Sequence, residues 1–164
     1  MKIHNDGYDF RRDAPLGDQK AFRSPPVRVS LEAGERLFRL VTALKNNLLA
    51  SPWWFRRDTF QAMAHMSKVQ NCSIPEVARA KLAVTTEMNE RLDHLCIIEV
   101  IQPVYAWEGP ARHQSEPRDG GTVELMGGLR QLYLPHLVSD RGAGRGGFDS
   151  SPIVKYQYHG PIVP

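Results

Sequence analysis

The chain has 164 residues, of which 41% are hydrophobic and 24% charged, as in a globular protein with one core. The net charge of +3 is mild and the arginines are scattered, so the dense basic stripe of a nucleic-acid-binding protein is absent, and the charge suits an anionic small ligand equally well. No apolar run approaches the roughly 20 residues that span a bilayer, and the chain does not begin with an apolar signal segment. We therefore expect no membrane contact and a protein that is cytoplasmic or delivered into a target cell by a signal-independent secretion system.

The cysteines and histidines show no metal-binding pattern. Cys72 and Cys96 stand alone, without a CxxC spacing, and are expected to be reduced, buried thiols. The six histidines include no HxH or HExxH spacing. The sequence therefore predicts no metal site.

The first 28 residues differ from the rest of the chain. They are polar and basic and are interrupted by Pro15, Pro25 and Pro26. Such a segment is typical of a flexible arm or linker. We therefore predict an arm over residues 1–28 and a single domain over residues 29–164.

The first clear strand is predicted over residues 35–41. Alternation places Leu37, Arg39 and Val41 on one face of this strand. An arginine on an apolar face needs a partner, because an unpaired buried charge is costly. The partner is either a carboxylate of the protein or the phosphate of a ligand, which the guanidinium group matches well.

A loop is expected over residues 46–55, and it ends in an unusual aromatic cluster. Ser51 and Pro52 precede three consecutive aromatic residues, Trp53, Trp54 and Phe55. Such a cluster either packs in the core or forms a stacking wall for a planar ligand ring.

Two helices should follow. Asp58 is the expected N-cap of a helix that continues to about Gln70. Residues 73–76 form a capping box for a second helix. The apolar stripe of this second helix consists of Ile74, Val77, Ala78 and Leu82.

The second half of the chain is predicted to be mostly strands. Residues 94–101 are almost continuously apolar and predict a central strand, and residues 104–107 continue the sheet. Long loops are expected over 108–128 and 139–151, and a closing strand over 153–158. The order of elements is that of an α+β fold, and no GxGxxG or Walker A sequence is present.

Residues 127–135 have the most informative pattern. Gly127 and Gly128 permit a turn with backbone angles that other residues rarely adopt. A short apolar strand follows and ends at Pro135. Gln131 lies where the turn becomes a strand, a place that holds a side chain rigidly toward a cleft.

Arg39, then Ser51-Pro52-Trp53, then Gln131 stand in an order that resembles the ADP-ribosyltransferase fold. The sequence is most similar to the NAD-hydrolysing branch of that family, typified by the tuberculosis necrotizing toxin, whose last motif is a glycine-rich turn, glutamine, apolar strand and proline. Residues 103–114, which include Gly109-Pro110-Ala111 and Gln114, also resemble that branch. The chain departs from it in having Leu49-Ala50 before the serine-proline, where the branch has a tyrosine. The two helices over 58–84 are an insertion.

The resemblance implies an ADP-ribosyltransferase-like split β-sheet core with an inserted helical pair, and NAD as substrate without a metal. In that family Arg39 would bind the NAD phosphates. Ser51, Trp53 and Trp54 would line the nicotinamide side, and Gln131 would occupy the catalytic position. It further implies an NAD glycohydrolase, or an ADP-ribosyltransferase with a macromolecular acceptor, and a cognate immunity protein as partner.

The chemistry of this family raises one question about Gln131. Cleavage of the nicotinamide–ribose bond passes through an oxocarbenium-like state, which a neutral glutamine stabilises less than a glutamate does. Three glutamates of the preceding loop are therefore candidates for an accessory carboxylate: Glu108, Glu116 and Glu124.

Two other functions stay open. A small ribonuclease-type toxin would use histidine acid-base pairs drawn from His94, His113, His136 and His159, and predicts two histidines in one cleft. A non-catalytic binding or immunity module predicts an exposed tryptophan patch and an Arg39 paired with an internal carboxylate.

Overall fold

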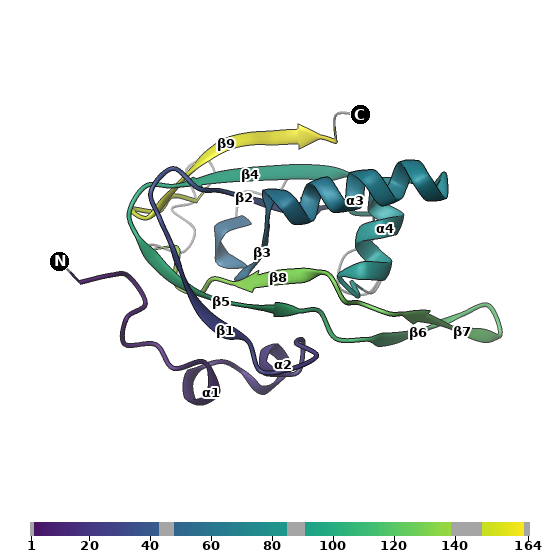
Figure 1. Ribbon diagram of the computed structural model, residues 1–164, viewed down its shortest axis with the longest axis horizontal. Helices are drawn as coiled ribbons and strands as arrows, with labels where there is room; N and C mark the ends of the chain where they lie inside the picture. The colour runs from purple at the N-terminus through teal and green to yellow at the C-terminus, as the bar shows by residue number, and fades with distance from the viewer. Residues whose placement is uncertain (1, 43–47, 85–90, 139–148, 163–164) are drawn as a thin grey trace.

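The computed structural model describes residues 2–42, 48–84, 91–138 and 149–162, which form a sheet-based α+β fold (Figure 1). The helices are α1 (Phe10–Asp13), α2 (Leu16–Gln19), α3 (Arg57–Gln70) and α4 (Ile74–Lys81), with a 3₁₀ turn at Leu48–Ala50. The strands are β1 (Val27–Leu31), β2 (Arg36–Val41), β3 (Trp53–Arg56), β4 (His94–Val100), β5 (Val104–Pro110), β6 (Gln114–Arg118), β7 (Gly121–Leu125), β8 (Arg130–Tyr133) and β9 (Val154–Pro161).

Seven strands form one antiparallel sheet in the order β1-β5-β8-β3-β2-β4-β9. The short strand β3 joins its two halves: Trp53 and Trp54 pair with β8, whereas Phe55 and Arg56 pair with β2. Strands β6 and β7 form a separate hairpin that projects from the sheet (Figure 1). The α+β class predicted from the sequence is confirmed.

The two faces of β2 enter different cores, as the alternation predicts. Leu37 and Val41 belong to a cluster that also includes Trp54, whereas Phe38 and Leu40 pack in a second cluster against the helices. Strand β4 lies inside the sheet between β2 and β9, as expected for a strand of nearly continuous apolar sequence.

The helical pair between β3 and β4 is present, and α3 and α4 lie together on the right of Figure 1. In α4 the Ser73 side chain accepts a hydrogen bond from the Glu76 amide, and the Glu76 carboxylate accepts one from the Ser73 amide. The predicted Asp58 cap of α3 is wrong. Strand β3 runs directly into α3, so Arg56 is the N-cap and Asp58 lies in the first turn. There the negative charge of Asp58 interacts favourably with the helix dipole.

Residues 1–28, for which the sequence predicts an arm or linker, contain α1 and α2 in the described part. Phe10 and Phe22 of this segment are buried in a third apolar cluster with Trp107 and Tyr133. The segment runs alongside β1 and β5 (Figure 1), and its backbone forms bridges from His4 to Val104 and from Phe22 to Ala111. The boundary at residue 29 itself stays a prediction.

Two predicted loops contain strands. Trp53–Phe55 belong to β3. Three consecutive aromatic residues show no alternation of apolar and polar positions, so the sequence does not indicate this strand. The loop predicted over 108–128 holds the end of β5 and the hairpin of β6 and β7, which are polar because few of their side chains are buried. Most of the loop predicted over 139–151 lies outside the described residues.

Candidate functional site

A cavity of about 390 Å³ lies where β2, β3, β8, α4 and the N-terminal segment meet. All five residues that the sequence singles out as an NAD site line it: Arg39, Ser51, Trp53, Trp54 and Gln131. Its other described lining residues are Gly17, Asp18, Ala21, Leu40, Phe55, Ala78, Leu82, Ala83, Val84, Leu92, Arg112 and Gln114. The cavity therefore has an apolar wall from α4 and the residues after it, and a polar wall formed in part by the N-terminal segment.

Arg39 is a cation within this cavity. Its Nη1 atom donates a hydrogen bond to the Leu48 carbonyl oxygen at 2.8 Å, and its guanidinium carbon lies 5.8 Å from the centroid of the Trp54 ring. Burial lowers the pKa of Arg39, and the nearby groups of Cys96, Tyr156 and Asp149 counteract this shift. Arginine nevertheless stays protonated in proteins.

The nearest carboxylate that acts on Arg39 is bound to other groups. Asp149 is buried, with an exposed fraction of 6%, and accepts hydrogen bonds from the Tyr156 hydroxyl at 2.5 Å and the Leu49 amide at 3.0 Å. Among the described residues, Arg39 forms no ion pair within 4.0 Å. The described residues thus balance its charge only in part, which suits it to an anion.

The two tryptophans of β3 differ in burial. Trp54 is 1% exposed and belongs to the main core, and its indole nitrogen donates to the Ser51 carbonyl oxygen at 3.2 Å. Trp53 is part-buried, and its ring centroid lies 5.2 Å from that of Tyr133 and 5.5 Å from that of Phe22. Both therefore pack against the protein and also line the cavity.

Gln131 lies on β8 opposite Gly109 of β5. Its Nε2 atom donates to the Ala21 carbonyl oxygen at 3.1 Å, so the N-terminal segment fixes the orientation of its amide. With the amide nitrogen assigned as this donor, the carbonyl oxygen of the Gln131 side chain is the atom that accepts hydrogen bonds.

The glycine turn before Gln131 contacts helix α4. Gly127 and Gly128 have φ angles of +68° and +100°, as the sequence predicts for a turn that only glycine adopts readily. The Gly127 amide donates to the Ala80 carbonyl oxygen at 2.8 Å, and the Leu129 amide to that of Lys81 at 3.1 Å. The turn thus satisfies carbonyls at the end of α4, which an isolated helix leaves without partners.

The structure does not bring the candidate glutamates to the cavity. Glu108 accepts from Arg56 Nε at 2.7 Å, with Arg130 at 3.9 Å. Glu124 interacts with His113 and the Ser115 hydroxyl on the projecting hairpin. Glu116 is buried there, with an exposed fraction of 4%.

Sequence reasoning missed two charged residues that line the cavity, Asp18 and Arg112. Asp18 lies in α2, within the segment whose prolines and polar composition indicate a linker. Arg112 follows β5 in the predicted loop. No local pattern reveals either position, because both depend on how distant segments fold together.

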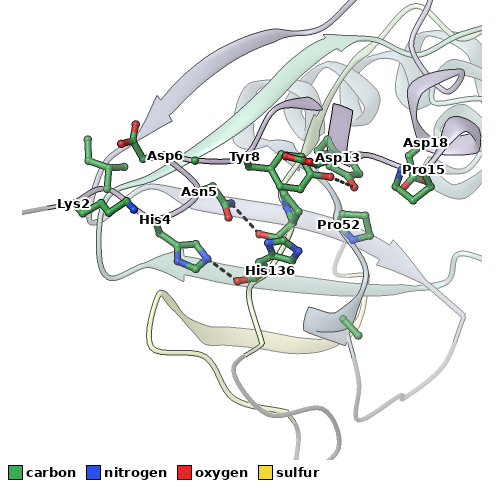
Figure 2. Close-up of a pocket in the computed structure, with 15 residues that line it drawn as sticks. Lys2, His4, Asn5, Asp6, Tyr8, Asp13, Pro15, Asp18, Pro52 and His136 are labelled. Atoms are coloured by element: carbon green, nitrogen blue, oxygen red, sulfur yellow. Dashed lines mark hydrogen bonds between the residues drawn. The ribbon is translucent and has the colours of Figure 1, made fainter. Parts of the chain in front are cut away.

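A second, larger hollow of about 950 Å³, drawn in Figure 2, shares the lining residue Asp18 with the first. It is lined by His4, His136, Pro52 and the carboxylates of Asp6, Asp13 and Asp18, among others. His4 Nε2 lies 2.6 Å from the His136 carbonyl oxygen and is engaged there. Two histidines thus share a hollow, but its three carboxylates disfavour the phosphodiester of an RNA substrate.

The remaining histidines and tryptophans do not form the sites that the alternatives require. The ring centroids of His94 and His159 lie 6.4 Å apart, and both ring nitrogens of His159 are buried. His113 is bound to Glu124. Trp54 and Trp107 are buried, so the described tryptophans form no exposed patch.

The described part of the chain offers neither a metal-binding cluster nor a membrane-spanning helix. No group of three or more His, Cys, Asp or Glu residues is placed to hold a metal ion. No helix there is both long enough and apolar enough to cross a membrane.

The fold is shared with a solved structure of low sequence identity. The chain resembles Rhs1-CT, solved in complex with its cognate immunity protein RhsI1, with a TM-score of 0.51 and 12% identity over 87% of this chain and 86% of that one. A structure of Tne2 in complex with Tni2 has a TM-score of 0.42 and 14% identity over 84% of this chain and 94% of that one. No family model and no curated protein matches the sequence. At this identity the likeness to Rhs1-CT shows the fold alone.

Proposed function

We propose that the protein is an NAD-consuming toxin or effector domain that cleaves the nicotinamide–ribose bond of NAD. The observation that carries this function is the meeting of Arg39, Ser51, Trp53, Trp54 and Gln131 in one cavity. These residues come from three separate parts of the chain, whose order in the sequence is the one that resembles the ADP-ribosyltransferase family.

The cavity has the groups that binding of NAD requires. Its volume of about 390 Å³ lies in the range of ligand sites. Arg39 offers a guanidinium group without a carboxylate partner among the described residues, and this group matches a phosphate. The ring of Trp53 offers an apolar face to the planar nicotinamide.

The sheet organisation also fits this function. Strand β3 divides its pairing between β8 and β2, so the seven-stranded sheet has two halves joined at the cavity. We assign this arrangement to the split β-sheet core of the ADP-ribosyltransferase fold. Helices α3 and α4 are then an insertion, and α4 contributes Ala78 to the cavity wall.

The reaction needs little acid–base chemistry. The glycosidic bond breaks with its electron pair remaining on the nicotinamide nitrogen, which loses its positive charge, while positive charge develops on the ribose. Water then gives ADP-ribose in a hydrolase, or a macromolecular nucleophile gives an ADP-ribosylated product in a transferase. The carbonyl oxygen of Gln131 would accept a hydrogen bond from the ribose.

A partner protein and a delivery route follow from the same proposal. The Rhs1-CT structure, which shares the fold, was solved with a cognate immunity protein. We infer that this chain likewise has an immunity protein and acts as a delivered effector.

The test is to incubate the protein with NAD and follow free nicotinamide. We expect turnover by the wild type and at least about a tenfold loss of kcat/KM in Arg39→Ala and in Gln131→Ala, since each removes a contact to the reacting substrate. Arg36→Ala, on the same strand but outside the cavity, and Gln61→Ala, exposed on α3, are the matched controls.

Two further arms separate the remaining alternatives. Absence of turnover by the wild type would overturn the function, and full turnover in Gln131→Ala would overturn the role of that residue. Glu108→Gln and Glu124→Gln should keep turnover, because neither carboxylate lines the cavity. NAD labelled in the adenosine part distinguishes hydrolysis, which yields free ADP-ribose, from transfer, which labels a macromolecule.

A further inference from the structure

Asp18 is a lining residue of two neighbouring cavities. It lines both the cavity assigned to NAD and the larger hollow beside it, so its side chain lies at the boundary between the two. Figure 2 shows it at the end of the hollow near Pro15 and Pro52. Among the described residues that line the NAD cavity, it is the one carboxylate, and the cations there are Arg39 and Arg112.

We propose that Asp18 is a catalytic residue that supplies the negative charge Gln131 lacks, facing the positive charge that develops on the ribose of NAD. This role rests on the NAD-cleaving function proposed above. Asp18 is then the carboxylate of the site. Glu108 is paired with Arg56 and Glu124 with His113, both outside the cavity.

The Asp18 carboxylate is part-buried beside the Tyr133 hydroxyl. Desolvation raises the pKa of Asp18, and the Tyr133 hydroxyl opposes this rise in part. Asp18 takes part in no ion pair with a described residue. Its charge is therefore not spent on a salt bridge within the described protein.

The backbone around Asp18 is tied to Gln131. The Ala21 amide donates to the Asp18 carbonyl oxygen at 3.2 Å, and the Ala21 carbonyl in turn accepts from Gln131 at 3.1 Å. The Arg112 amide donates to the same Ala21 carbonyl at 2.9 Å. One turn of backbone thus sets the carboxylate and the glutamine relative to each other, as a preorganised site requires.

The charge balance of the step explains the need for a carboxylate. The C1′–N bond breaks, nicotinamide leaves with the electron pair, and C1′ carries the positive charge until the oxygen of water bonds to it and one proton is released. A fixed anion speeds the reaction only if it stabilises the transition state more than it stabilises bound NAD. It must therefore face the ribose and not the phosphates. A preorganised charge in a site of reduced water content has a large effect on the rate.

The experiment compares Asp18→Asn with Asp6→Asn in the full chain. Asp6 lines the larger hollow but not the NAD cavity, so its variant removes the same charge from the same region. Nicotinamide release is measured for kcat and KM, and ADP-ribose binding is measured by calorimetry. We expect Asp18→Asn to lower kcat at least about tenfold, with KM and ADP-ribose affinity within about threefold of wild type, and Asp6→Asn to match wild type.

Each outcome decides the question. A wild-type kcat in Asp18→Asn, in a protein whose Arg39→Ala variant has lost turnover, overturns the role of Asp18 and leaves the function intact. A wild type that releases no nicotinamide overturns the function and this role together. If asparagine disturbs folding, Asp18→Glu and Asp18→Gln, equal in size and different in charge, replace it. Equal kcat in that pair overturns the role, and a higher kcat for Asp18→Glu supports it.

Discussion

Gly127 shows how a single residue fixes the position of strand β8. Its φ is +68°, and a Cβ atom at this position would lie 2.4 Å from the Ala111 carbonyl oxygen. This oxygen belongs to the backbone, so it cannot move away by a side-chain rotation. A side chain is therefore excluded both by conformation and by space. The turn also carries the amide that caps α4 through Ala80.

We expect Gly127→Ala to lower the free energy of unfolding by about 1–3 kcal/mol or more, because it combines a strained φ with a backbone clash. Urea denaturation followed by circular dichroism measures the change. Gly121→Ala is the matched control, since its nearest contact would be the Arg118 carbonyl oxygen at 3.8 Å and its φ is not in the left-handed region. An equally stable Gly127→Ala variant would show that the turn adapts.

At the residue scale, alternation and turn chemistry locate two of the candidate side chains, Arg39 and Gln131, on their strands. The pattern of β2 places Arg39 correctly among apolar neighbours, and Gly127-Gly128 places Gln131 at a strand start. Asp18 was beyond such reasoning. Nothing in a polar, proline-interrupted stretch shows that it folds back over β8, because that packing depends on contacts more than 100 residues apart in sequence.

Among the elements, helix α4 connects the capping box to the cavity. Its N-terminus is closed by Ser73 and Glu76, its side chains include Ala78 in the cavity wall, and its last carbonyls accept from the glycine turn. Fraying of its first turn would thus loosen one wall of the site.

We expect Ser73→Ala to cost about 0.5–2 kcal/mol of stability, because the Glu76 amide loses its hydrogen-bond acceptor. Thermal denaturation gives the magnitude, and hydrogen exchange of the first α4 amides locates it. Ser115→Ala, an exposed serine on the projecting hairpin, provides the comparison. Unchanged exchange at the first turn of α4 would mean that packing, not the cap, holds this helix end.

At this scale the sequence predicts an element best where its signal is local. A capping box is read from four adjacent residues, so α4 could be located within a residue of its start. Strand β3 has four residues, and each half of it pairs with a different neighbour. Its identity therefore depends on strands far away in the sequence, and its run of aromatic residues has no period to indicate it.

The described part of the molecule is organised around three apolar clusters, one of which depends on the N-terminal segment. Phe10 is 6% exposed and its ring lies 5.1 Å from that of Tyr133 and 5.6 Å from that of Phe22. Tyr133 in turn packs against Trp53 in the cavity wall. A segment held by such contacts should unfold with the sheet and not before it.

We therefore expect Phe10→Ala to lower the free energy of unfolding by about 3–5 kcal/mol, the range for removing a buried phenylalanine. Leu16→Ala in the same segment is the control and should stay within about 0.5 kcal/mol of wild type, since Leu16 is 71% exposed. Denaturation is followed by tryptophan fluorescence, which reports on Trp53 and Trp107, and by circular dichroism. If Phe10→Ala leaves both transitions unchanged, the segment is an appended arm, and the wall that it forms with Ala21 against Gln131 contributes nothing to the stability of the sheet. A single shifted transition in both signals would instead make the N-terminal segment part of the domain that holds the site.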